Sequence, residues 1–268
     1  MEILRKGIFI FLLAGLFSCM DNTTDDISSD TSPKDTLFIS IPKTKYTGIY
    51  DTLGYTLLIN TISKEKYESI SYPFSNTDSL RNIICGDKED RCMEAMESYY
   101  ISKIGNKVSR KDELLTLELS NGKKVLLKNN KSDGDGYEVY QFISLDKNNY
   151  FIVAAFYMES YAYLLINANN GKTYSTVGLP SSSPNNNFYI AGNCDIMAAF
   201  TFNGLELMTK TGDSILSNIK IDFPIWGPEE VKWKDDSTLY VKQKSQTGDD
   251  FKEEYNFAAI RIRKKMSI

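Results

Sequence analysis

The chain has 268 residues, of which 42% are hydrophobic and 25% are charged, and its formal net charge is −4 at pH 7. That length can bury a sizeable core, and the weakly negative charge provides no field that would draw in nucleic acid. Histidine is absent, which excludes histidine-based nucleophile systems and the commonest zinc ligand. We find no cofactor motif, metal-ligand set or catalytic constellation in the sequence, and therefore expect a protein that is not an enzyme and carries no cofactor.

The first 18 residues have the organisation of a secretion signal. Arg5 and Lys6 precede an apolar run that extends to Phe17. As a helix this run would rise only about 16 Å, roughly half the hydrocarbon thickness that a spanning helix must cross. Cations, a short apolar run and a small residue at the end are typical of a cleaved signal peptide, which we predict for residues 1–18.

The end of this segment, Leu16-Phe17-Ser18-Cys19, resembles the lipobox of bacterial lipoproteins. The resemblance implies that the sulfur of Cys19 receives a diacylglyceryl group, that cleavage occurs just before it, and that the new N-terminus is acylated by a fatty acid such as palmitate. Several acyl chains would hold the protein to a membrane, since each buried methylene contributes about 0.8 kcal/mol. The implied location is the cell envelope, with the outer membrane favoured. An ordinary secretory signal with a chance cysteine is the alternative.

Residues 19–36 contain acidic residues among Ser, Thr and Asn, with almost nothing apolar. Such a segment cannot bury enough surface to offset the entropy lost on ordering, so we predict a lipidated, disordered tether. Acidic residues behind the cysteine resemble, weakly, the surface-export signals of some lipoproteins, whereas a simple solvated linker is the favoured interpretation. A periplasm-facing and a surface-exposed orientation both stay open.

We expect a single β-rich domain over residues 37–268. Residues 37–41 and 55–59 are rich in β-branched and aromatic side chains and predict strands in an N-terminal part, 37–84. A helical insertion, 85–110, follows, because apolar side chains there recur at steps of three and four residues. These side chains are Met93, Met96, Tyr100 and Ile104. They predict one helix over residues 88–104.

Two of the remaining cysteines, Cys85 and Cys92, lie close together at the start of this insertion. A continuous helix would separate their α-carbons by about 10 Å, too far for a disulfide. Gly86 allows the chain to fold back there, and an envelope location is oxidising. We therefore favour a Cys85–Cys92 disulfide over two free thiols, and we interpret Cys194 as a small core residue.

Residues 111–262 contain an internal repeat. Ile152-Val153-Ala154-Ala155-Phe156 returns as Ile196-Met197-Ala198-Ala199-Phe200, an offset of 44. Ser183-Pro184 with Tyr189 returns, at the same offset, as Gly227-Pro228 with Trp233. Glycine turns recur at Gly122, Gly171 and Gly212.

A period in the low forties is typical of a propeller blade. The pattern resembles WD-repeat-like β-propellers, in which a Ser-Pro turn leads into a strand and a Gly-Lys turn joins the outer pair of strands. The fold class expected is mainly β, with one helix and about four antiparallel, propeller-like blades, either closed in a ring or open. A two-sheet β-sandwich is the alternative.

A tyrosine group, Tyr157, Tyr161 and Tyr163, is the candidate binding site, because aromatic faces bind sugars and protein partners. Alternation of side chains on strands also explains it. The segment 131–136 has the glycines and aspartates of a calcium loop but the wrong first ligand, so we interpret it as a hairpin turn. Neighbouring carboxylates form four pairs: Glu229-Glu230, Asp235-Asp236, Asp249-Asp250 and Glu253-Glu254.

Three functions fit these observations. The first is a lipid-anchored binding module for an envelope protein, peptide or glycan. The second is an envelope glycan hydrolase, which requires carboxylates such as Asp135, Asp195, Asp235 or Glu230 to converge on one cleft. The third is an immunity-type protein that neutralises a toxin acting in the envelope. The absence of a catalytic set favours the first.

Overall fold

The computed structural model describes residues 36–40, 47–51, 54–71, 77–86, 91–197, 200–247 and 252–265. Within these ranges the protein is mainly β, with seventeen strands and three α-helices. The predicted signal peptide, Cys19 and all of the predicted tether except Thr36 lie outside the described residues, so those expectations stay predictions.

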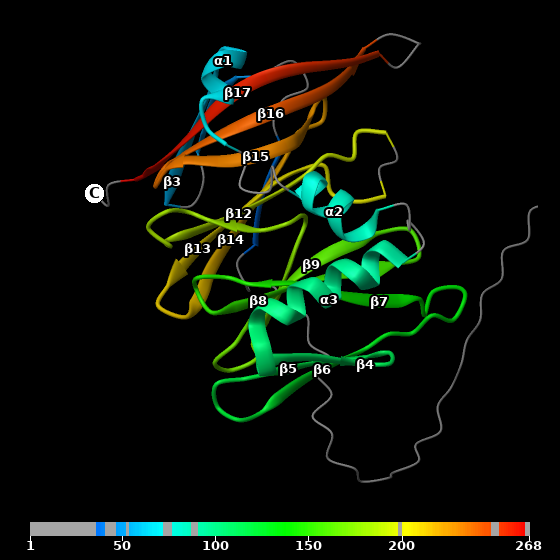
Figure 1. The fold of residues 1–268 in the computed structure, drawn as a ribbon. Coiled ribbons are helices and arrows are strands. Elements are labelled where there is room, and N and C mark those ends of the chain that lie inside the picture. The colour runs from blue at the N-terminus through cyan, green and yellow to red at the C-terminus, as the bar shows by residue number, and fades with distance from the viewer. Residues whose placement is uncertain are drawn as a thin grey trace, which may run out of the picture.

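The strands form four sheets, which we number by the order of their central strands along the chain (Figure 1). The first sheet contains β4 (Val108–Lys111), β5 (Leu114–Glu118) and β6 (Lys124–Lys128). The second contains β7 (Glu138–Leu145), β8 (Tyr150–Tyr157), β9 (Tyr161–Asn167) and β10 (Thr173–Thr176). Each is an antiparallel meander of consecutive strands.

The third and fourth sheets combine consecutive strands with strands from the N-terminal part. The third contains β11 (Ser181–Ser182), β12 (Phe188–Asn193), β13 (Gly204–Thr211) and β14 (Ser214–Asp222), with β1 (Thr36–Ser40) added parallel to β14. The fourth contains β15 (Gly227–Asp235), β16 (Thr238–Thr247) and β17 (Lys252–Lys264), followed by β3 (Tyr55–Thr61) and β2 (Gly48–Asp51). Both strands expected near the N-terminus are therefore present: β1 forms an edge of the third sheet, and β3 lies in the fourth sheet between β17 and β2.

The helices are α1 (Lys64–Glu68), α2 (Thr77–Cys85) and α3 (Cys92–Ile104), and a 3-10 turn, Gly105–Lys107, follows α3. The expectation of a single helix is therefore wrong. Ser63 caps α1, accepting a hydrogen bond from the Lys66 amide. In α2 the one-turn spacing of Leu80 and Ile84 places both against the Cys85–Cys92 region.

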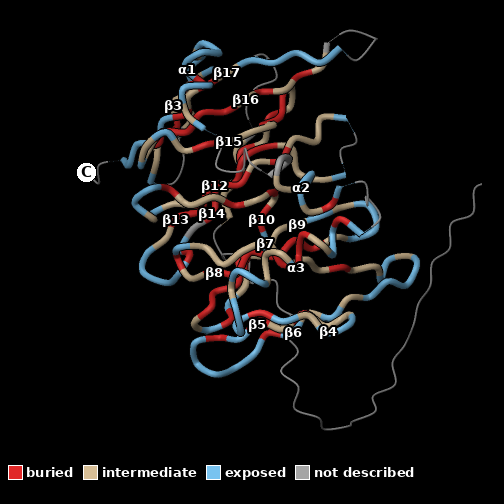
Figure 2. Tube along the Cα trace, in the orientation of Figure 1, coloured by how far each residue is buried: buried red, intermediate tan, exposed pale blue. Residues whose placement is uncertain are grey.

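Three core clusters join the sheets in succession. One packs the first sheet and α3 against the second, another packs the second against the third, and the largest packs the third against the fourth. Residues 150–155 of β8 and 204–209 of β13 are buried throughout, as expected for strands covered on both faces (Figure 2). No cluster of described residues joins the first sheet to the fourth. The described part is an open stack of four sheets, rather than the two layers of a sandwich.

The 44-residue register read from the sequence does not match this structure. Ile152 to Phe156 lie in β8, but Ile196, Met197 and Phe200 lie in the loop between β12 and β13. Tyr189 and Trp233 lie in corresponding strands of successive sheets, but Tyr189 is near the start of β12 and Trp233 is near the end of β15. An apolar five-residue motif can occupy a strand or a partly exposed loop, so it marked a similarity of composition rather than of position.

The glycine turns do mark equivalent positions. Gly122 lies between β5 and β6, Gly171 between β9 and β10, and Gly212 between β13 and β14. All three have positive φ, between 56° and 80°, which a tight hairpin turn requires and glycine adopts without a Cβ clash. The glycine turns, rather than the apolar five-residue motif, therefore recur at equivalent positions in successive sheets.

Candidate functional site

The predicted tyrosine group divides between the surface and the core. Tyr157 and Tyr161 flank the β8–β9 turn, which a hydrogen bond from the Tyr157 amide to the Ser160 carbonyl closes at 2.8 Å. Their side chains are 36% and 41% exposed, and Met158 between them is 57% exposed. Tyr163 packs edge-on against Tyr161, at 6.1 Å between ring centroids, and supports it from the core between the second and third sheets.

Tyr161 links the second sheet to the third. Its hydroxyl donates to Oδ1 of Asn193 at 2.6 Å, and the Asn193 amide donates to Thr201 Oγ1 at 2.8 Å and to the Phe202 carbonyl at 2.7 Å. Burial raises the pKa of Tyr161 above its ordinary value, and the neighbouring Asp195 raises it further. The phenol therefore stays protonated and keeps its donor role.

The β12–β13 loop is held by its own polar side chains. Asp195 accepts hydrogen bonds from the Thr201 amide and hydroxyl, at 2.7 and 2.8 Å. Asn203 accepts from the Asp195 amide at 3.0 Å and donates to the Phe223 and Trp226 carbonyls at 2.6 and 3.0 Å. Because these groups fix the base of the loop, Met197 and Phe200 stay at the surface, 60% and 64% exposed.

We call Tyr157, Met158, Tyr161, Met197 and Phe200 the loop edge. Its members lie in or next to the hairpin loops of two successive sheets, and the Tyr161–Asn193 hydrogen bond joins the strand ends beside those loops. Large apolar side chains grouped on a surface mark interaction sites more often than isolated ones do. Only the tyrosines were singled out from the sequence. Met197 and Phe200 were missed because their motif was interpreted as a repeated strand.

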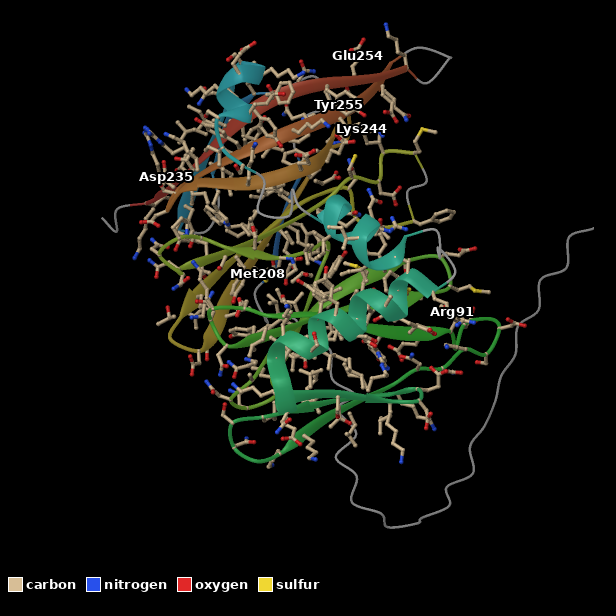
Figure 3. The ribbon with its side chains drawn as sticks, in the orientation of Figure 1. Arg91, Met208, Asp235, Lys244, Glu254 and Tyr255 are labelled. Atoms are coloured by element: carbon tan, nitrogen blue, oxygen red, sulfur yellow. A yellow bond between two sulfur atoms is a disulfide. The ribbon has the colours of Figure 1, made fainter. Side chains whose placement is uncertain are left out.

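A ladder of charged side chains lies beside this edge, on the outer face of the fourth sheet. Lys242 pairs with Glu229 at 2.6 Å and with Glu230 at 3.6 Å. Lys244 pairs with Glu253, to which the Tyr255 hydroxyl donates at 2.6 Å. Figure 3 shows Lys244, Glu254 and Tyr255 at one end of this sheet and Asp235 at the other.

The charged groups of this ladder are paired with one another and are not arranged for proton transfer or nucleophilic attack. The hydrogen bond to Glu253 raises the pKa of Tyr255 to about 12, and the Lys244 partner lowers the pKa of Glu253. Burial lowers the pKa of Lys242, but its bonds to Glu229 and Glu230 outweigh that effect and raise it overall. A tyrosine with a raised pKa and carboxylates paired to lysines make a poor nucleophile and poor proton carriers at neutral pH.

The carboxylates named for a hydrolase each bind local partners. Asp195 closes its own loop, Asp235 accepts from the Ser237 amide at 3.0 Å, and Glu230 accepts from the Tyr67 hydroxyl at 2.7 Å. Asp135 is exposed in the β6–β7 loop, where Gly134 has a φ of 92° and amide–carbonyl bonds pair Asn130 with Glu138. That segment is thus a hairpin turn. Among the described residues, no group of three or more Cys, Asp or Glu side chains is placed to hold a metal ion.

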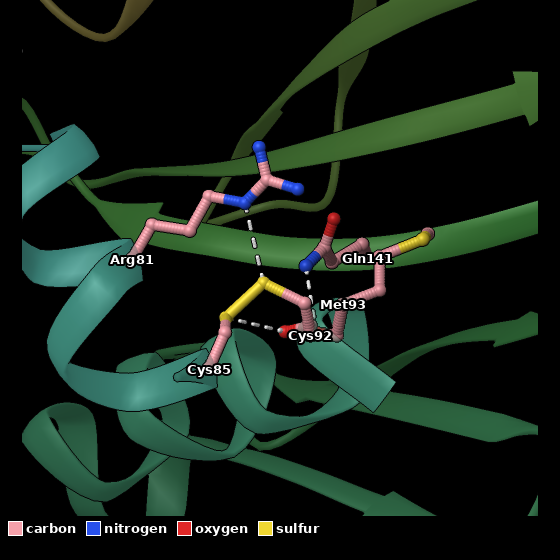
Figure 4. The surroundings of a disulfide bond; sticks show 5 residues. All are labelled: Arg81, Cys85, Cys92, Met93 and Gln141. Carbon is pink, nitrogen blue, oxygen red and sulfur yellow. Dashed lines mark hydrogen bonds between the residues drawn. A yellow bond between two sulfur atoms is a disulfide. The ribbon is translucent and has the colours of Figure 1, made fainter. Parts of the chain in front are cut away.

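Cys85 and Cys92 form a disulfide, with their α-carbons 4.8 Å apart (Figure 4). Cys85 ends α2, and Gly86 turns the chain with a φ of 53°, so the two cysteines do not share a continuous helix. Cys194 has a free thiol that is half-buried rather than in the core, and burial raises its pKa. A thiol with a raised pKa is mostly protonated and unreactive at neutral pH.

A buried ion pair positions α3 between the first two sheets. Arg110 binds Glu97 through two hydrogen bonds, at 2.9 and 2.7 Å, and donates to the Tyr140 carbonyl at 2.6 Å. Glu97 also accepts from the Phe142 amide at 2.7 Å. This arrangement pairs both charges, but no sequence spacing indicates it, because Glu97 and Arg110 lie in different elements.

A scan against models of protein families and a search of curated proteins found no match to this chain. Among the described helices, none is long and apolar enough to cross a membrane.

Proposed function

We propose that the protein is a cell-envelope lipoprotein that acts as a binding module, held to the outer membrane through Cys19 and engaging an envelope protein, peptide or glycan through the loop edge. The observation that carries the binding role is the grouping of exposed aromatic and methionine side chains on two hydrogen-bonded loops. The lipobox resemblance supports the anchor. The four sheets, three of them with a glycine turn before their last meander strand, support an open arc of about four propeller-like blades.

The chemistry of the loop edge suits a partner with an apolar or ring surface. Aromatic side chains combine a large apolar face with a polar atom, and methionine adapts to irregular contours. Tyr161 is already fixed by its bond to Asn193, so less rotamer entropy is lost when a partner binds.

Pull-down from detergent-solubilised membranes tests this role. The bait is the full chain, and the variant Met197→Ser/Phe200→Ser removes exposed apolar area without touching the core. Leu216→Ser is the matched control, because Leu216 is 57% exposed and lies in β14, outside the loop edge. We expect the loop-edge variant to lose at least tenfold of the captured partner and the control to retain it.

Equal capture by all three chains would exclude the loop edge as the binding surface. The anchor has its own test: labelled fatty acid should enter the wild-type chain and not Cys19→Ala. Equal incorporation into both would refute lipidation at Cys19 and leave the binding result standing.

A further inference from the structure

The outer face of the first sheet is the feature that the proposed binding role does not use. The strand register places Lys111, Leu114 and Lys128 in one row across the sheet, Ser109, Thr116 and Leu126 in the next, and Glu118 and Lys124 in the last. The opposite face carries Val108, Leu115, Leu117 and Val125 into the core. The lysine-bearing face is thus the open end of the stack.

This end of the molecule carries a concentration of positive charge. Residues 103–131 contain eight of the 31 Lys and Arg residues and three of the 35 Asp and Glu residues, a net charge of +5 in a chain of net charge −4. The rest of the chain therefore carries −9. Such asymmetry is a recognised mark of a charged partner. Two of the eight cations are paired away from the outer face: Arg110 with Glu97 in the core, and Lys131 with Glu113.

The lysines of this face are only partly neutralised. Lys124 pairs with Glu118 at 3.0 Å, and both side chains are about half exposed. Lys111 and Lys128 are exposed and form no ion pair with any described residue. Lys107 and Lys123, in the adjoining turns, extend the positive surface.

A solubilising cap alone does not require this pattern. Terminal units of stacked proteins need a polar outer face. On the fourth sheet, Lys242 pairs with two glutamates and Lys244 with a third, and α1 packs against the same face. On the first sheet no element with described residues covers the outer face, and Lys111 and Lys128 have no such carboxylate partner among those residues.

An apolar side chain lies among these lysines. Leu126 is 56% exposed in the middle row, between the rows of Lys128 and Lys124. Lysine stems can lie along an apolar surface while their ammonium groups reach phosphate. A positive face with one exposed leucine fits the boundary between lipid headgroups and acyl chains.

We propose that the outer face of the first sheet docks on an anionic lipid surface, with Lys111, Lys124 and Lys128 contacting headgroup phosphates. The proposal rests on the proposed function only in placing the chain beside a membrane. The acyl anchor would tether the protein, and this face would orient it, leaving the fourth sheet at the far end of the stack.

Vesicle co-sedimentation tests the face without the anchor. The protein is a chain beginning at residue 20, which contains every described residue, and the probes are phosphatidylcholine vesicles with and without phosphatidylglycerol. We expect binding to the anionic vesicles only, weakening as salt is raised. Each lysine near an anionic surface contributes roughly fivefold, so Lys111→Gln/Lys124→Gln/Lys128→Gln should bind roughly 100-fold more weakly.

The matched control is Lys64→Gln/Lys66→Gln/Lys252→Gln, which makes the same change of net charge at exposed positions of α1 and β17. It should bind the anionic vesicles within about twofold of the parent, since its positions lie beyond screening distance of the docked face. All substituted lysines are exposed, so circular dichroism and urea unfolding should be unchanged.

Three outcomes would overturn the proposal: no binding to anionic vesicles at low salt, equal losses in the two triple variants, or binding of duplex DNA as tight as that of the vesicles. The last would assign the face to polyanions in general rather than to lipid. Failure of fatty-acid incorporation at Cys19 would instead count against the anchor, and leaves this test unaffected.

Discussion

The first and fourth sheets each pack one face into a core, but their outer faces differ. The first sheet has three strands, and its outer face is bare among the described residues. The fourth has five strands, two of them from the N-terminal part, and α1 packs on its outer face through Tyr67, whose ring is tilted against Phe257 with the ring centroids 4.9 Å apart. The fourth sheet is thus extended and covered by segments from the N-terminal part, whereas the first sheet ends the stack with an exposed, charged face.

The attachment of the two ends differs as well. The fourth sheet is held by the largest apolar cluster, including Trp226, which is 1% exposed. The first sheet depends on a smaller cluster and on the Arg110–Glu97 ion pair, which connects it to α3 and to the second sheet. The comparison predicts that replacing a buried polar side chain destabilises the first sheet, and that truncating a buried aromatic or aliphatic side chain destabilises the fourth.

Arg110→Ala should have the largest effect. It leaves the Glu97 carboxylate buried without its partner, and removing one member of a buried pair destabilises by about 3–5 kcal/mol. Urea unfolding measures this loss. Lys124→Ala, which breaks only an exposed pair with Glu118, is the control and should change stability by less than about 1 kcal/mol. Similar values for both would show that the ion pair does not hold the first end.

Tyr67→Ala should destabilise the fourth end by about 3 kcal/mol, because truncating a buried aromatic leaves a cavity. Lys232, whose Nζ lies 3.6 Å from the Tyr67 ring centroid, would then become hydrated. Tyr67→Phe keeps the ring and loses the bond to Glu230, so it should cost about 1 kcal/mol. If the two substitutions are equally harmful, the hydroxyl rather than the packing of α1 completes this sheet.

Loss of the disulfide should have an intermediate effect, because the loop it closes is short. Cys85→Ser/Cys92→Ser is expected to lose about 2.5 kcal/mol by loop entropy. Hydrogen exchange should quicken in α2 and the start of α3 and stay unchanged in β16 and β17. Faster exchange in the fourth sheet would contradict the separation of the two ends.

Lys244→Gln should have the smallest effect on stability, but it should change the pKa of Glu253. Lys244 and Tyr255 hold the pKa of Glu253 below its usual value, so this contribution is present above the unfolded pKa and is lost as the pH falls through the folded pKa. The variant should raise the pKa of Glu253 toward its usual value in an NMR titration. An unchanged pKa would mean that the Tyr255 hydrogen bond alone sets it.

The sequence predicted the β-rich class, the two N-terminal strands, the glycine turns and the pairing of Cys85 with Cys92, because each depends on local chemistry. It did not predict the register of the repeat, since the motif at Ile152 to Phe156 has the same composition as the loop that bears Met197. The helices α1 and α2 were missed because each is short. In the loop edge, the tyrosines could be proposed from the sequence. Met197 and Phe200 could not, because their position beside the tyrosines depends on how the second and third sheets pack together.

The late pairing of the N-terminal strands has a consequence for how the chain folds. In β3, Ile59 pairs with Ile260 of β17, about 200 positions further along the chain. Closing so long a loop is entropically unfavourable and slow, so the fourth sheet can be completed only after the last strand has emerged. A nascent chain would remain without this pairing until β17 has been synthesised, and a chain truncated before β17 would leave β3 with an unpaired edge.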